Sequence, residues 1–402
     1  MARMAVDPKD RARGMMVGLA VGDAMGSPLE GLSWQDIQQR FGAVTDYRES
    51  FPLEEAVRMS GRLTRRDFDR AMRAWRMAGL YTDDAQQAIA VAYLLARGGD
   101  ISGAEIAEEF VRMSGIPMMG AYFGAFRGTS DFFRTSIVTY RRQKDWKQCG
   151  VATAGNGAAS RIAPAGFFYR ADLDTMFWRV AEVSLVTHRD PRAIAAAYAV
   201  AWLTARLSGL DAWPGTHVLE PLALATQAAE DRLMQEYRED LLVGAEHAHD
   251  FSRVLLRADR ALKTQPATIL DEIMKAANEN ATERVSSPTG PYAPASVVTA
   301  IVAAATQGGS GFETAVTRAV ALGGDTDSVG AIVGALCGVF WGLEGIPERW
   351  RDKLANSEGL VRYGDGLVDP LHRDIPDPLD AESRLCAEEE RLRQAIASKV
   401  KA

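Results

Sequence analysis

Two short acidic motifs lie far apart in the sequence, each at the start of a helical pattern: Thr82-Asp83-Asp84, and Asp325-Thr326-Asp327-Ser328 after two glycines. Neighbouring carboxylates repel each other unless a cation or a proton lies between them. Mg²⁺ and Mn²⁺ prefer oxygen ligands, and two such ions need several carboxylates at one place. The motifs therefore indicate a site for hard divalent cations. Helix capping and complementation of the helix dipole are the alternative interpretation.

Three loops carry further candidate residues. Glu30 follows Pro28 in a segment that reads as a loop, where catalytic acids are often presented, although a single loop glutamate is more often simply exposed. The turn Gly155-Asn156-Gly157 could offer backbone N–H groups to a phosphate, and a plain tight turn is the simpler interpretation. His188 comes just before a helix start and could face a ligand or be an ordinary loop residue.

Arginines recur near one helical stripe at positions 62, 66, 70 and 73, with Arg65 and Arg76 close by. A solvated face with Asp67 and Asp69 as ion-pair partners explains this stripe. A docking surface for an acidic partner or for substrate phosphates is the sharper hypothesis.

Composition restricts the class of protein. The 402 residues include 46 basic and 53 acidic side chains, and the net charge of −7 argues against a general nucleic-acid or anionic-membrane binder. Three widely spaced cysteines predict neither a disulfide framework nor a zinc cluster, which fits a reducing cytoplasm. The charged N-terminal segment lacks the apolar stretch of a signal peptide.

Apolar residues recur at helical spacing along the chain, and regular strand alternation is lacking, so we predict an all-α fold. Helices are expected at 10–22, 67–77, 84–96, 104–113, 175–186, 192–207, 218–239, 252–263, 269–277, 295–306, 311–322, 328–343 and 382–397. The apolar segment 329–343 has 15 residues, short of the roughly 20 that cross a bilayer, and predicts a buried core helix.

Two of these helices carry glycine every fourth residue: Gly18, Gly22 and Gly26 in one, and Gly330, Gly334, Gly338 and Gly342 in the other. Each glycine inside a helix costs about 1 kcal/mol relative to alanine. A stripe without side chains lets another backbone approach closely, so the second helix is expected to be a central strut that holds its acidic N-terminus rigidly.

Taken together, the motifs resemble those of the ADP-ribosylglycohydrolase family. The resemblance rests on five segments in order: 18–30, 82–84, 155–158, 187–188 and 323–334, with Ile346-Pro347 and Trp350 fitting the end of the family pattern. It implies an orthogonal all-α bundle with two Mg²⁺ or Mn²⁺ ions in a central cleft. By the same resemblance, the metal ligands would be Thr82, Asp83, Asp84, Asp325, Asp327 and Ser328.

The resemblance also suggests roles for the loops. Glu30 would be a catalytic acid on a loop near the metals and our candidate general base, with Asp325 helping to hold the water. The segment Gly155, Asn156 and Gly157 would line the diphosphate region, and His188 would lie near the substrate. Two departures concern the pocket: Ala85 stands where the family usually has a hydroxyl residue, and Ser160 replaces a common methionine.

One domain is expected over 1–379, with a probable insertion at 41–80 and a charged C-terminal helix at 380–402. We predict a hydrolase that cleaves the bond between ADP-ribose and an acceptor, either a protein side chain or a small molecule. The alternatives are a catalytically silent ADP-ribose-binding module and a two-metal nucleotide-diphosphate phosphohydrolase. The acceptor and the oligomeric state cannot be predicted from the sequence.

Overall fold

The computed structural model describes residues 6–49, 75–115, 123–371 and 374–401. These residues form α-helices, short 3-10 turns and connecting loops, and β-pairing within them is limited to isolated bridges. The prediction of an all-α fold is confirmed.

The helices follow one another along the whole chain. The longer ones are α1 (Pro8–Gly26), α2 (Trp34–Phe41), α5 (Asp83–Gly98), α6 (Gly103–Ser114), α7 (Asp131–Gln143), α10 (Leu173–Leu185), α11 (Pro191–Leu207), α12 (Leu219–Glu236), α13 (Asp250–Thr264), α14 (Ile269–Asn278), α15 (Ala293–Gln307), α16 (Phe312–Val320), α17 (Thr326–Trp341), α19 (Ser357–Val368) and α20 (Pro378–Lys401). Shorter elements are η1 (Ser27–Leu29), α8 (Gly157–Ser160), α9 (Ala163–Phe168), η2 (Gly215–Val218), η3 (Ala245–His247), η4 (Pro266–Thr268), η5 (Gly308–Ser310), η6 (Leu343–Gly345) and α18 (Glu348–Lys353).

Helices α1 and α17 are antiparallel and touch through their glycine stripes. A Cβ atom added to Gly22 would lie 1.9 Å from the carbonyl oxygen of Gly330, and one added to Gly18 would lie 2.4 Å from that of Gly334. A Cβ atom added to Gly26 would lie 2.0 Å from the carbonyl oxygen of Thr326. The expected close backbone approach is confirmed, and the structure adds that each glycine stripe is the partner of the other.

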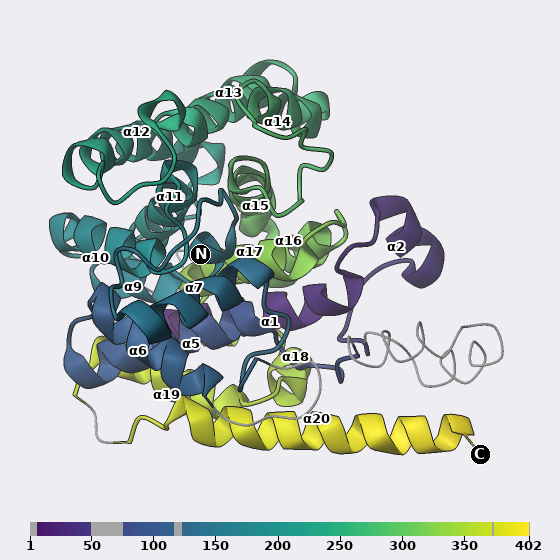
Figure 1. Cartoon of the computed structure of the whole chain (residues 1–402). Helices are drawn as coiled ribbons and strands as arrows, with labels where there is room; N and C mark the ends of the chain where they lie inside the picture. Colours follow the sequence, from purple (N-terminus) through teal and green to yellow (C-terminus); the bar gives the residue numbers. More distant parts are fainter. Residues whose placement is uncertain (1–5, 50–74, 116–122, 372–373, 402) are drawn as a thin grey trace.

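The other helices surround this central pair (Figure 1). Helices α12, α13 and α14 form the top of the molecule in this view, and the long helix α20 runs along its lower edge. Helix α17 is buried along nearly its whole length, as expected for a core helix. Among the described residues, no helix combines the length and the apolar character needed to cross a bilayer.

Several helices were not expected from the sequence. Helix α19 contains three glycines, and one of them, Gly364, packs directly against the backbone of Arg13 in α1. Helix α7 is rich in aromatic and β-branched residues, and Ser130 caps its start by accepting from the N–H of Phe133. The predicted helix at 67–77 falls mostly outside the described residues, and 75–77 are not helical.

Candidate active site

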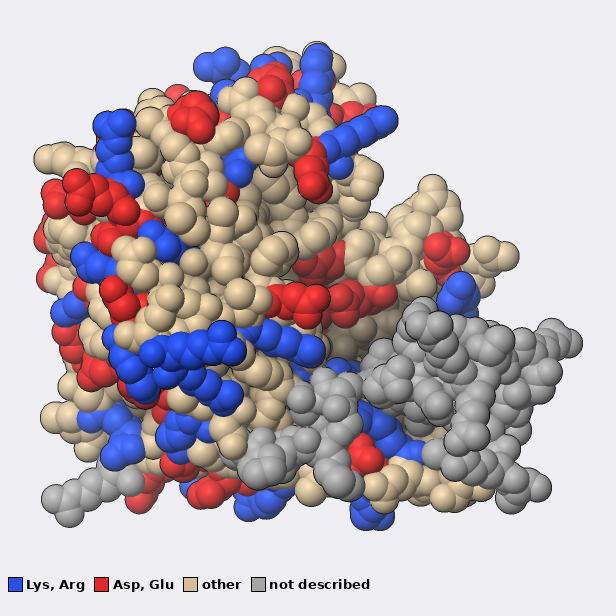
Figure 2. All heavy atoms as spheres, in the orientation of Figure 1, with Lys and Arg blue, Asp and Glu red and all other residues tan. Residues whose placement is uncertain are grey.

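The pairing of α1 and α17 fixes where the acidic motifs meet. Because the two helices are antiparallel, the C-terminal end of α1, which leads to Glu30, lies beside the N-terminal end of α17, which follows Asp325. Figure 2 shows acidic side chains gathered in a recess near the centre of one face, in the region of α1 and α17.

A short two-way backbone pairing connects the Glu30 loop to the loop before Asp325. Gly31 donates its N–H to the carbonyl of Gly324 at 2.8 Å, and Gly324 donates to Leu32 at 2.9 Å. Gly323 and Gly324 have φ angles of +79° and +83°, a left-handed backbone that favours glycine. The double glycine therefore shapes the turn that holds Asp325 next to the Glu30 loop.

The start of α5 is held by a buried carboxylate of α1. Asp23 is fully buried, and its two oxygens accept from the N–H groups of Thr82 at 2.8 Å and Ala85 at 2.9 Å. Thr82 is the N-cap residue of α5 and accepts from the N–H of Asp84. The free N–H groups of this helix end are thus satisfied largely by residues other than Asp83 and Asp84.

Asp84 joins the two acidic motifs. Ser328 Oγ donates to Asp84 Oδ2 at 2.8 Å, and the hydroxyl of Ser160 donates to Asp84 Oδ1. Asp83 lies at the same helix start, where Gln87 Nε2 donates to its Oδ2 at 2.7 Å. Ser160 thus makes a contact in the site that the sequence did not predict, and Ala85 is buried in the core.

Asp325 is held from the side by the loop at 155–157. Asn156 Nδ2 donates to Asp325 Oδ2 at 2.9 Å and to Ser296 Oγ at 3.2 Å. This loop is itself fixed, because the N–H of Asn156 donates to Pro291 and the N–H of Ala293 donates to Ala154. Within the described residues, the Asp325 carboxylate makes no capping hydrogen bond to its own helix.

His188 packs against the same glycine loop. A Cβ atom on Gly155 would lie 3.3 Å from His188 Nε2, and one on Gly157 would lie 3.7 Å from Cε1. Arg161 donates to Thr187 Oγ1 at 2.5 Å, and Thr187 Oγ1 lies 2.7 Å from His188 Nδ1. The contact with Thr187 holds the Nδ1 side of the ring, and Nε2 faces Gly155.

The pKa of His188 is lowered to about 3 by burial and by the charge of Arg161. The imidazole is therefore neutral at physiological pH. His188 is therefore a neutral side chain next to the glycine loop and not a cation.

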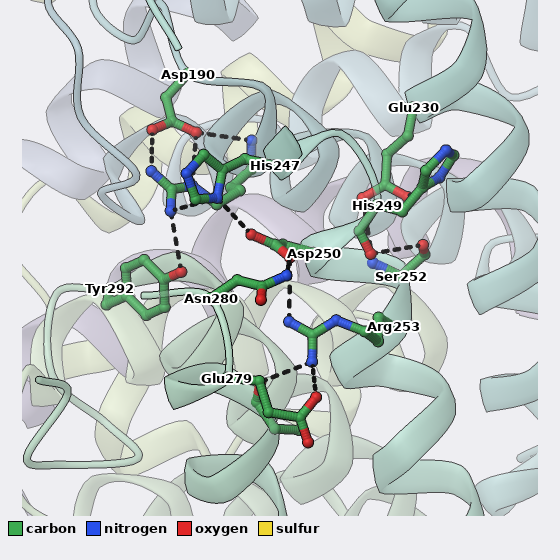
Figure 3. A network of polar contacts seen from close by, with 12 residues as sticks. Asp190, Glu230, His247, His249, Asp250, Ser252, Arg253, Glu279, Asn280 and Tyr292 are labelled. Atoms are coloured by element: carbon green, nitrogen blue, oxygen red, sulfur yellow. Dashed lines mark hydrogen bonds and ion pairs between the residues drawn. The ribbon is translucent and has the colours of Figure 1, made fainter. Parts of the chain in front are cut away.

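A second polar network anchors these loops to the helices above them (Figure 3). Arg192 Nη2 donates to Asp190 Oδ2 at 2.6 Å, and Arg192 Nη1 donates to Tyr292 Oη at 3.4 Å. Asp190 follows His188 by two residues, and Tyr292 pairs with Gly155. On the other side, His247 Nδ1 lies 2.8 Å from Asp250 Oδ2 at the start of α13. The network ties both candidate substrate loops to α11 and α13.

The clustered carboxylates shift one another's pKa values. The side chain of Glu30 is exposed, yet desolvation of its carboxylate and the charges of Asp325 and Asp84 raise its pKa to about 7, partly offset by Arg76. Burial and the charge of Asp325 raise the pKa of Asp84 to about 6, and burial with the charge of Asp84 raises that of Asp23 to about 8.

The two remaining acids of the motifs behave in the same way. Burial, followed by the charge of Asp84, raises the pKa of Asp83 well above its ordinary value. Burial, followed by the charge of Glu30, does the same for Asp327. Both shifts disfavour the charged forms of acids that face other acids.

These groups have the chemistry of a hard-cation site, because oxygen donors predominate and their mutual repulsion would be relieved by positive charge. In the part of the chain that the structure describes, however, no three His, Cys, Asp or Glu side chains converge closely enough to enclose an ion. The donor types fit Mg²⁺ or Mn²⁺.

The structure joins Asp84 to Ser328 and Asp325 to Asn156, and it packs His188 against the glycine loop. The roles of these residues as metal ligands or substrate contacts stay predictions. The arginines at 62, 65, 66, 70 and 73 lie outside the described residues. Arg76 is buried, 7% exposed, and is therefore not part of a solvated stripe. Asp23 was missed as a site residue because its helical context reads as a simple helix end, although a buried acid within an apolar glycine-rich helix is itself unusual.

The chain belongs to the ADP-ribosylglycohydrolase family, whose sequence model matches residues 4–377. The protein is therefore a glycosidase-type hydrolase that acts on ADP-ribosyl bonds. It is 26% identical to ADP-ribosylarginine hydrolase Tri1 of Pseudomonas putida, over 92% of this chain and 81% of that protein. It is 24% identical to the ADP-ribosyl-[dinitrogen reductase] glycohydrolase of Rhodospirillum rubrum, over 86% of this chain and 90% of the relative.

The fold is also shared with a solved structure. A protein described as an ADP-ribosylglycohydrolase-related protein complex superposes with a TM-score of 0.59, over 91% of this chain and 99% of that chain, at 24% identity. The predicted fold class, an all-α bundle of the ADP-ribosylglycohydrolase type, is confirmed.

Proposed function

We propose that this protein releases ADP-ribose from a modified protein side chain in a reaction that depends on Mg²⁺ or Mn²⁺. The observation that carries the proposal is the hydrogen bond of 2.8 Å from Ser328 to Asp84. It joins the two acidic motifs at one place, beside the Glu30 loop. Arginine is the first acceptor to test, because one relative is named an ADP-ribosylarginine hydrolase.

The ions would be held by Thr82, Asp83, Asp84, Asp325, Asp327 and Ser328. When bound, they would supply positive charge that orients the ribose hydroxyls and acidifies a water molecule. A bound cation would relieve the repulsion between these carboxylates.

The remaining roles fall to side chains of the recess. Glu30 would remove a proton from the water that attacks the anomeric carbon, because its raised pKa suits a base near neutral pH. As the new C–O bond forms, the bond from the anomeric carbon to the acceptor breaks, and the acceptor atom takes a proton. The N–H groups near Gly155 would bind the diphosphate, and the ring of His188 would lie beside it.

The test uses purified protein and an arginine-ADP-ribosylated protein, with either Mg²⁺ or EDTA, and mass spectrometry of the products. Intact ADP-ribose should appear with Mg²⁺ and not with EDTA. Asp325→Asn should lower the rate by about 100-fold or more, as loss of a ligand or water-orienting group typically does. Failure to release ADP-ribose from arginine, serine or acetylated ADP-ribose, with either metal, would refute the proposal.

A further inference from the structure

The C-terminal helix α20 lies beyond residue 377, the last residue matched by the family model, yet it contacts residues next to the acidic motif of α5. Its residue Glu382 is fully buried. Both oxygens of this carboxylate are in use: Oε2 accepts from Arg127 and Gln86, each at 2.6 Å, and Oε1 accepts from Tyr81 at 2.6 Å.

The three donors surround the start of α5. Tyr81 directly precedes the Thr82-Asp83-Asp84 motif, and Gln86 lies in the first turns of the helix. Arg127 is fully buried, donates Nε to the carbonyl of Tyr81, and accepts the N–H of Asp83 on its own carbonyl at 2.8 Å. Glu382 is thus linked to the backbone of Asp83 through one intermediate residue.

The hydrogen bonds among Glu382, Gln86 and Arg127 form a closed ring. Gln86 Oε1 accepts from the N–H of Arg127 at 2.9 Å, and Gln86 Nε2 donates to Ala125 as well as to Glu382. Cys386, one turn further along α20, donates to Ala125 at 3.4 Å. The loop at 125–127 is therefore held between α5 on one side and α20 on the other.

A second set of contacts ties α20 to the segment that enters the site. Trp75 packs against Ile396, and Arg393 Nη2 donates to the carbonyl of Trp75 at 3.4 Å. Arg76, whose positive charge faces Glu30, lies 3.8 Å from Glu389. Helix α20 therefore contacts the chain at several points between 75 and 86.

We propose that Glu382 is a positioning residue, through which α20 sets the placement of Asp83 and Asp84 in the acidic site. The inference rests on the proposed function, because it assigns these two aspartates to ion binding. A buried ion pair with two further hydrogen bonds holds its partners in one geometry, whereas loss of one member leaves an uncompensated buried charge.

The test compares Glu382→Gln with Glu388→Gln, which makes the same charge change at an exposed position of α20. Two readouts do not depend on catalysis: hydrogen exchange of a peptide covering 81–87, and the Mn²⁺ dissociation constant measured by calorimetry. In Glu382→Gln we expect exchange at least about tenfold faster and Mn²⁺ affinity about 10–100-fold weaker. In Glu388→Gln both should stay within about twofold of the unmodified protein.

A double variant separates positioning from general stability. Arg127→Met with Glu382→Leu replaces the buried pair by apolar side chains, which often restores stability. If Glu382 positions the aspartates, this variant should melt near the unmodified protein but still bind Mn²⁺ weakly. Recovery of both properties would overturn the proposal, as would a Glu382→Gln variant that matches Glu388→Gln in both readouts.

Activity is measured last, so that the two proposals can fail separately. Glu382→Gln should lower kcat more than it raises KM, because the ligands of the reacting centre are displaced. If the unmodified protein released no ADP-ribose, the proposed function would fail, while hydrogen exchange and Mn²⁺ affinity would still decide the role of Glu382. If Mn²⁺ also failed to bind, unchanged exchange in Glu382→Gln would overturn the inference and faster exchange would support it.

Discussion

At the scale of single residues, the helix starts show how an acid at a capping position becomes available for other chemistry. The N–H groups at the start of α5 are bound by Asp23 and by the hydroxyl of Thr82. Asp83 and Asp84 therefore need not serve as caps, and their carboxylates face side chains instead. Asp325 occupies the N-cap position of α17, yet its carboxylate accepts from Asn156.

Glu30 gives the first prediction at this scale. Glu30→Gln keeps the size of the side chain but removes the base, so the rate of ADP-ribose release should fall by about 10²–10⁴. The pKa of about 7 places the acid limb of the pH–rate profile near neutrality, and a bound cation should shift that limb to lower pH.

Initial rates measured between pH 5 and pH 9, at saturating Mg²⁺, check this prediction. Glu348→Gln, at an exposed position of α18, is the matched control and should keep the full rate. An acid limb that persists unchanged in Glu30→Gln, with a rate within tenfold of the unmodified protein, would assign the base to another residue.

At the scale of elements, the α1–α17 pair decides where the chemistry lies. The two glycine stripes allow backbone contact, and this contact brings the end of α1 to the start of α17. Side chains at these positions would separate the helices and pull the Glu30 loop away from Asp325. The position of the site is thus a consequence of helix packing, because both loops are attached to the ends of the packed pair.

Gly22→Ala tests this packing. The added methyl group would lie 1.9 Å from the carbonyl oxygen of Gly330, and that atom belongs to the backbone, so one helix must move. We expect a loss of about 3 kcal/mol or more in the free energy of unfolding. Gly98→Ala is the control, because nothing lies within 4 Å of the new methyl group there, and alanine should be neutral or slightly stabilising.

Urea unfolding followed by circular dichroism measures both variants. Equal unfolding midpoints for Gly22→Ala and Gly98→Ala would mean that the central pair can relax without loss, contrary to the packing described here.

Much of this arrangement could be predicted from the sequence, and the failures have physical causes. The long helices follow from periodicity, and the glycine spacing of four predicted a close approach. The partner of each stripe could not be predicted, because spacing within one helix says nothing about which other helix it meets. The contacts of Asp23 and Ser160 were not predicted, because they are made to residues distant in the sequence. The contribution of α20 was missed for the same reason, since Glu382 reaches Arg127 across the fold.

At the scale of the whole molecule, the acid cluster couples folding, protons and ions. Glu30 and Asp23 have pKa values of about 7 and about 8 in the folded protein, above the roughly 4 expected for unfolded carboxyls. Between pH 6.5 and pH 8.5 the folded state therefore holds protons that the unfolded state has lost. The stabilisation from these groups is complete below about pH 4 and decreases as the pH rises above that value. Its last part is lost as the pH passes through this window.

His188 does not change the stability of the protein between pH 6.5 and pH 8.5. Its pKa is lowered to about 3, and the unfolded value is about 6.5, so above pH 6.5 the ring is mostly neutral in both states. Glu230 in α12, whose pKa is raised to about 8 chiefly by burial, adds to the same loss of stability. Glu230 belongs to the network of Figure 3. Its contribution to the free energy of unfolding should therefore not respond to ions bound at the acidic motifs.

The final prediction combines these effects. Without divalent ions, the melting temperature should fall as the pH is raised from 6.5 to 8.5. At pH 8.5, Mn²⁺ should raise it by a few degrees, because a cation relieves the repulsion that protons relieve at lower pH, and about 100-fold excess over the dissociation constant stabilises by about 2.7 kcal/mol. Calorimetric melting of the EDTA-treated protein at both pH values measures this, and Asp84→Asn should abolish most of the Mn²⁺ response. A melting temperature indifferent to Mn²⁺ at pH 8.5 would show that the carboxylates of α5 and α17 do not hold the ion.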